Sequence, residues 1–102
     1  MKKSEANLAI QVLPKVEGAE IYRVVEAVIS YIESTGLEYF VGPFETAIEG
    51  DFDRLCDVAK ECQLICIRKG AASVSTYMKM MYNPTDGMKN ISEKMAKFHG
   101  EK

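Results

Sequence analysis

The chain has 102 residues, of which 13 are basic and 15 acidic, giving a formal net charge of −2. This length indicates a single domain over residues 1–102. The balanced charge argues against a nucleic-acid-binding protein, which would carry a basic stripe. No apolar run reaches the roughly 20 residues that a membrane-spanning helix needs. The first residues lack a signal-peptide cleavage pattern, and an odd set of three cysteines fits reduced thiols. We therefore expect a cytoplasmic protein.

The spacing of apolar residues changes along the chain between a period of two and a helical period. The expected elements, in chain order, are a strand at 6–13, a helix at 19–35, strands at 37–41 and 44–49, a helix at 51–69 and a strand at 72–82. Gly42-Pro43 interrupts the middle strands, which predicts that they pair as a hairpin. Asp51 is the expected cap of the second helix. A short C-terminal helix is expected to follow Thr85 or Asp86.

Each long helix has one apolar seam, so both need the same sheet face to bury against. With right-handed crossovers, the order βαββαβ predicts an α+β ferredoxin-like sandwich. Its four-stranded antiparallel sheet carries both helices on one face. Unrelated functions share this fold, so function has to be argued from particular residues.

Cysteines and carboxylates are the first candidates for metal-binding or catalytic residues. Cys62 and Cys66 lie one helical turn apart, but only His99, near the C-terminus, remains as a nitrogen ligand. We interpret the thiols as small core side chains and expect neither a metal nor a cofactor; the sequence assigns no role to Cys56. Glu45 and Glu49 lie on the same side of a strand. They could act together in acid–base catalysis, or they could be charges on an edge strand that discourage aggregation.

The two sheet faces are expected to differ. The helix-covered side gathers rings, thioethers and hydroxyls: Tyr39, Phe44, Met78, Met80, Thr46 and Thr76. Such a set can line a pocket for a flat heteroaromatic ligand or serve simply as core. The opposite face has no helix to cover it and is half apolar: Asn7, Ala9, Gln11, Leu13, Phe40, Ala47, Tyr77 and Met81. An exposed face of this kind is typical of a subunit interface.

The segment GPFETAIEG, residues 42–50, resembles the G-P-x-x-T-x-(I/V)-E-G signature of the small thiamine-binding protein family, also called the YkoF-like or MTH1187-like family. The segment 36–39, Gly-Leu-Glu-Tyr, is similar to that family's approach to its second strand, and the likeness covers nearly the whole chain. The resemblance implies a non-catalytic protein that binds thiamine or its hydroxymethylpyrimidine moiety, as a carrier or sensor in thiamine metabolism or transport. It also implies a homo-oligomer, typically a tetramer built by sheet-face packing.

By this resemblance, Thr46 and Glu49 are the first expected ligand-binding residues. A hydroxyl can form hydrogen bonds with the polar edge of an aminopyrimidine. A carboxylate can compensate the positive charge of a thiazolium ring, and aromatic side chains can stack on the ligand. Alternation places Thr46 and Glu49 on opposite sheet faces. The full expected set is Thr46, Glu49, Tyr39, Phe44, Thr76 and Met78. Two alternatives stay open: a small metal-independent enzyme for a hydrophobic or heteroaromatic substrate, and a structural or regulatory oligomer without a ligand.

Overall fold

The computed structural model describes residues 4–87. Its elements are β1 (Ala6–Pro14), α1 (Glu20–Ser34), β2 (Tyr39–Val41), β3 (Thr46–Gly50), α2 (Phe52–Arg68) and β4 (Val74–Tyr82). All six expected elements are present in the expected order. The expected C-terminal helix and His99 lie outside the described residues.

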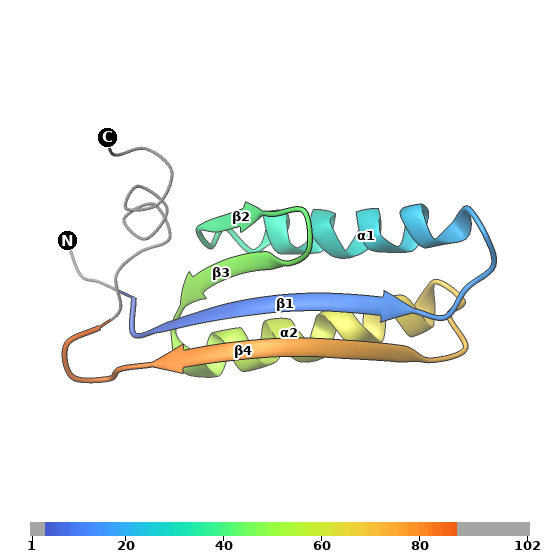
Figure 1. Cartoon of the computed structure of the whole chain (residues 1–102). Coiled ribbons are helices and arrows are strands. Elements are labelled where there is room, and N and C mark those ends of the chain that lie inside the picture. The colour runs from blue at the N-terminus through green and yellow to red at the C-terminus, as the bar shows by residue number, and fades with distance from the viewer. Residues whose placement is uncertain (1–3, 88–102) are drawn as a thin grey trace.

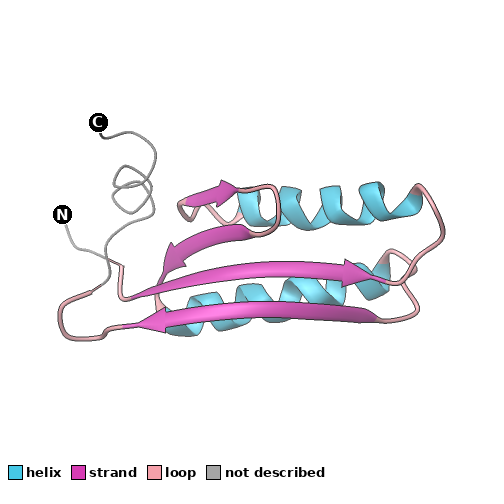
Figure 2. Ribbon diagram, in the orientation of Figure 1, coloured by secondary structure: helices cyan, strands magenta, loops and turns pink. Residues whose placement is uncertain are grey.

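The four strands form one antiparallel sheet in the order β2-β3-β1-β4, with both helices on one of its faces (Figures 1 and 2). The long strand β1 lies in the interior and pairs with β3 on one side and β4 on the other. This arrangement confirms the ferredoxin-like α+β prediction. Neither helix of residues 4–87 is long and apolar enough to cross a lipid bilayer.

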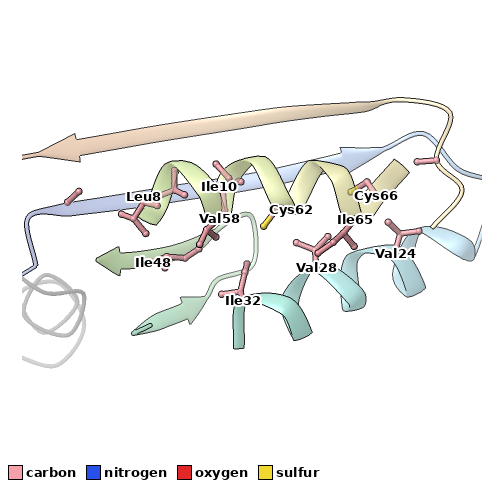
Figure 3. Packing of buried hydrophobic residues seen from close by; sticks show 14 residues of the cluster. Leu8, Ile10, Val24, Val28, Ile32, Ile48, Val58, Cys62, Ile65 and Cys66 are labelled. Atoms are coloured by element: carbon pink, nitrogen blue, oxygen red, sulfur yellow. The ribbon is translucent and has the colours of Figure 1, made fainter. Parts of the chain in front are cut away.

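The core lies between the sheet and the two helices (Figure 3). Its deepest large side chains are Leu8, Ile32, Ile48, Leu55, Val24, Val58, Cys62 and Cys66. Val24, Val28 and Ile32 follow one another at steps of four on α1 and are all buried, as expected for one apolar seam. Cys62 and Cys66 complete the corresponding seam of α2, which confirms their interpretation as core side chains.

The turn of the β2–β3 hairpin lies one residue later in the chain than predicted. The backbone N–H of Gly42 donates to the carbonyl of Glu45 at 2.9 Å, which leaves Pro43 and Phe44 at the tip of the turn. A Cβ at residue 42 would lie 2.9 Å from the same Glu45 oxygen, so only glycine fits there without a shift. The third strand therefore begins at Thr46, and the prediction that it begins at residue 44 was wrong.

The N-terminus of α2 is capped from a distant part of the chain. Asp51 occupies the cap position, as expected, but its side chain makes no capping hydrogen bond. Instead, the backbone N–H of Phe52 donates to Glu5 Oε2 at 3.0 Å. A carboxylate from the segment before β1 thus satisfies a free amide at the positive end of the helix.

Candidate functional site

A groove opens between α1 and the β2–β3 hairpin, with a cavity volume of about 230 Å³. Ile10, Val12 and Thr46 line it from the sheet, and Val41 to Glu45 line it from the hairpin. The helix side is aliphatic and is formed by Ile21, Val25, Val28, Ile29 and Ile32. The result is an apolar cleft with a few polar groups, the usual composition of a small-molecule site.

Thr46 is the buried polar residue of this groove, with 8% of its surface exposed. It stands opposite Ile10 on β1 and Val41 on β2, so its hydroxyl belongs to the helix-covered face, as alternation predicted. Glu45 lines the groove too, but its Oε2 lies 3.6 Å from Lys79 Nζ. Because Lys79 projects from the face without helices, the carboxylate of Glu45 is directed toward that face.

The structure brings two of the six expected ligand-binding residues to this groove, Thr46 and Phe44. Phe44 is 78% exposed, because it sits in the turn rather than on a strand. Met78 lines a different cavity, of about 310 Å³, between α2 and β4. Tyr39 lies on the edge strand β2 and is partly exposed. Thr76 lines neither cavity, and its Oγ1 is buried without a hydrogen-bond partner.

Glu49 lies on the opposite face from Thr46, as predicted, opposite Asn7 on β1. Its carboxylate does not behave as an edge charge. The strand β3 is interior, between β2 and β1, and Glu49 is only 8% exposed. The edge-charge interpretation was therefore wrong for this residue, because β3 is not an edge strand.

The two buried thiols of α2 are poorly suited to nucleophilic or metal chemistry. Burial, with smaller contributions from Cys66 and Glu61, raises the pKa of Cys62 from 9.0 to about 12. Burial also raises the pKa of the Cys66 thiol. Both stay protonated at neutral pH, whereas the reactive and metal-binding form is the thiolate. Across residues 4–87, no group of three His, Cys, Asp or Glu side chains could hold a metal ion.

The sequence contained a signal for the side of the groove that α1 forms, but these apolar residues were interpreted only as core residues. Ile21, Val25 and Ile29 lie beside the buried seam of α1 and are only half-buried. A helix needs one apolar stripe to cover a sheet. The additional width of the α1 stripe indicates a second apolar contact, and in the structure that contact surface is the groove.

Comparison with known proteins connects this architecture to a family. The model of a family described as "Thiamine-binding protein" matches residues 8–99. The chain belongs to the thiamine-binding protein family. The match runs from β1 past the last described strand, so the family assignment rests on nearly the whole chain and agrees with the resemblance of the segment 42–50.

Relatives of this thiamine-binding family member support the assignment. A protein of Clostridium perfringens named as a UPF0045 protein is 44% identical over 92 residues, covering 90% of this chain and 95% of that protein. A domain of unknown function from Bacillus cereus has a solved structure with a TM-score of 0.86 and 34% identity, covering 94% of this chain and 91% of that one.

A third relative has a name that refers to thiamine. It is a candidate thiamine biosynthesis or salvage protein from Thermotoga maritima, with a TM-score of 0.80 and 28% identity. The match covers 93% of this chain and 99% of that one. The similarity therefore extends over whole chains and is not confined to a shared motif.

Proposed function

We propose that this chain binds thiamine, or its hydroxymethylpyrimidine moiety, without catalysing a reaction, in the groove between α1 and the β2–β3 hairpin. It would act as a carrier or sensor in thiamine metabolism or transport. One observation carries the proposal: the buried hydroxyl-bearing residue of the groove, Thr46, belongs to the segment 42–50 that resembles the family signature. Family membership and the name of the Thermotoga maritima relative support the choice of ligand.

The size of the groove favours a single ring at its floor. Its volume of about 230 Å³ is below the roughly 300–1,000 Å³ of sites for drug-sized ligands. We therefore place the pyrimidine inside, between the aliphatic wall of α1 and Thr46. The thiazolium ring of intact thiamine would extend outward over the hairpin turn, where Phe44 offers an exposed aromatic face to a flat cation.

The polar groups of the groove match this orientation. A threonine hydroxyl both donates and accepts, so Thr46 can bond a ring nitrogen or the exocyclic amine of an aminopyrimidine. Valine and isoleucine side chains of α1 exclude water from that bond, which strengthens it. Of the six residues expected to bind ligand, the proposal retains Thr46 and Phe44 in one site. Tyr39, Glu49, Thr76 and Met78 lie outside this groove.

We further propose that the chain is a cytoplasmic homo-oligomer, a tetramer in which the sheet face without helices packs against its own copy. The centre of that face is flat, since Ala9 lies beside Ala47. Leu13, Tyr77 and Met81 are exposed around it. A half-apolar sheet face that no helix covers favours association.

Binding is tested by following thermal unfolding with thiamine and with hydroxymethylpyrimidine. Ligand at a hundredfold excess over its dissociation constant should stabilise the fold by about 2.7 kcal/mol. Thr46→Val should weaken binding roughly tenfold, the loss of about one hydrogen bond. Thr76→Val is the matched control, because it removes a buried hydroxyl from the same sheet face outside the groove.

The choice of ligand and the position of the binding site can be disproved separately. If neither compound raises the unfolding temperature, the chain does not bind thiamine-like ligands. If both compounds stabilise the protein but Thr46→Val binds as tightly as the wild type, the ligand lies elsewhere and Thr46 is a core residue.

A further inference from the structure

The cavity of about 310 Å³ between α2 and β4 is lined by three sulfur-containing side chains. Cys56 lines it from α2, and Met78 and Met80 line it from β4. Among the described residues, none lines both this cavity and the groove between α1 and the β2–β3 hairpin. One thiol and two thioethers therefore form a cluster of soft metal ligands that the proposed thiamine site does not use.

The geometry of the two elements directs these side chains to one place. Met78 and Met80 are two residues apart on β4, so they lie on the same face of the sheet, roughly 7 Å apart along the strand. Met80 stands opposite Leu8 of β1, a buried core residue that also lines the cavity. The face is thus the one that α2 covers (Figure 1). Cys56 and Ala59 are three residues apart on α2, which places both on the same side of the helix.

The cavity extends from the solvent to the core. Cys56 is exposed and Met78 is 49% exposed, so both lie at its mouth. Met80 is partly buried and packs against the core. Ala59 lines the cavity between them and is buried, but its side chain is too small to fill the space between helix and strand. A metal ion can therefore enter from solvent and reach all three sulfur atoms in the folded chain.

We propose that Cys56, Met78 and Met80 bind one Cu(I) ion in this cavity. Thiolate and thioether ligands select this soft monovalent ion over harder metal ions. On binding, the Cys56 thiol releases its proton to solvent, because the thiolate is the metal ligand, and no electron is transferred. A methionine side chain has three rotatable bonds and a polarisable sulfur, so both thioethers can turn toward an ion beside Cys56.

The charge of the cavity favours a monovalent ion over a divalent one. Lys60 is the one charged side chain among the described residues that line it. The other polar lining side chain besides the thiol is that of Gln63, whose Nε2 donates to the carbonyl of Ala59 at 3.0 Å. Cu(I) with one thiolate is neutral overall. Zn(II) with one thiolate would keep a net positive charge beside the Lys60 ammonium, and an uncompensated charge in an apolar cavity is costly.

Cys56 differs in its surroundings from the other two thiols of α2. Cys62 and Cys66 are buried in the core, and burial raises the pKa of both thiols. Neither of them lines this cavity, whereas Cys56 both lines it and is exposed to solvent. Cu(I) should therefore bind at Cys56, the cysteine to which the sequence assigned no role.

The test is the affinity of the full chain for Cu(I) alone, measured without oxygen by competition with the coloured chelator bicinchoninate. The wild type should bind one Cu(I) per chain. Cys56→Ser should weaken binding by at least about a hundredfold, because loss of a group that only supports a metal ligand already costs up to about a hundredfold. Met78→Leu and Met80→Leu keep the apolar volume and should each weaken binding roughly tenfold. Met81→Leu removes an exposed thioether outside the cavity and is the matched control, with wild-type affinity.

X-ray absorption at the copper edge identifies the ligands directly. The wild type should show only sulfur around the metal, and the Met78→Leu and Met80→Leu variants should show fewer sulfur neighbours. Failure to compete with bicinchoninate, equal affinity of Cys56→Ser and the wild type, nitrogen or oxygen bound to copper in the wild type, or tighter binding of Zn(II) than of Cu(I) would each overturn the proposal. Thr46→Val should bind Cu(I) as the wild type does, so failure of the metal site is distinguishable from failure of the thiamine site.

Discussion

Burial of Cys62 should make the stability of this protein depend on alkaline pH. The pKa of Cys62 rises from 9.0 to about 12 in the folded chain, mainly through burial. The folded state therefore keeps a proton that the unfolded chain loses above pH 9.0. The stabilisation is complete below that pH and is lost as the pH rises from 9.0 toward about 12, because the folded state binds more protons there.

Urea unfolding of the wild type and of Cys62→Ala between pH 8 and pH 10.5 measures this effect. The free energy of unfolding should fall more steeply with pH in the wild type, and the difference between the two slopes isolates Cys62 from the tyrosines and lysines that titrate in the same range. Parallel slopes would show that the thiol ionises in the folded chain as readily as in the unfolded one.

Individual site residues were predictable where a position depends only on alternation along its own strand. Thr46 and Glu49 were correctly assigned to opposite faces for this reason. The burial of Glu49 was not predictable, because it depends on β3 being an interior strand. Phe44 was misplaced because the bond between Gly42 and Glu45 closes the turn one step later than the Gly-Pro break indicates.

At the scale of elements, the N-terminus of α2 depends on a carboxylate 47 residues away in sequence, that of Glu5. Glu5→Ala should lower the free energy of unfolding by about 1 kcal/mol, the usual value of a helix cap. For a domain of this size, the corresponding drop in melting temperature is roughly 4–8 °C. Thermal unfolding followed by circular dichroism measures it.

Glu5→Gln separates the hydrogen bond from the charge. The amide oxygen of glutamine can still accept from Phe52, while the attraction of a carboxylate to the helix N-terminus is lost. The loss of stability should therefore be smaller than for Glu5→Ala. Equal stability of Glu5→Ala and the wild type would mean that solvent satisfies the Phe52 amide equally well.

This long-range cap shows why the elements were predictable and their ends were not. Periodicity reports which side of an element faces the core, and that information is local. Element ends depend on partners elsewhere in the chain, such as Glu5 for α2. The second strand begins at Tyr39 rather than residue 37, and Leu37 instead packs against the core from the preceding segment.

At the scale of the whole molecule, the strand order determines which surfaces remain for association. It leaves β4 as a long edge, and it leaves one sheet face without a helix (Figure 1). The sequence predicted the open face, because two helices can cover only one face. The position of β4 at the edge of the sheet became visible only with the strand order. A self-complementary face by itself joins two copies, so the proposed tetramer needs a second two-fold interface.

The contribution of the open sheet face to association should therefore be measurable by mutation. Ala9 lies at the centre of the open face, between Ala47 and Lys79, and Ala9→Arg would project a long charged side chain from it. We expect Ala9→Arg to halve the mass of the assembly, as measured by native mass spectrometry and light scattering. Ser30→Arg, on the exposed side of α1, should keep the wild-type mass. A folded Ala9→Arg protein with the full wild-type mass would exclude the open face from the assembly, and association would then have to rest on other surfaces.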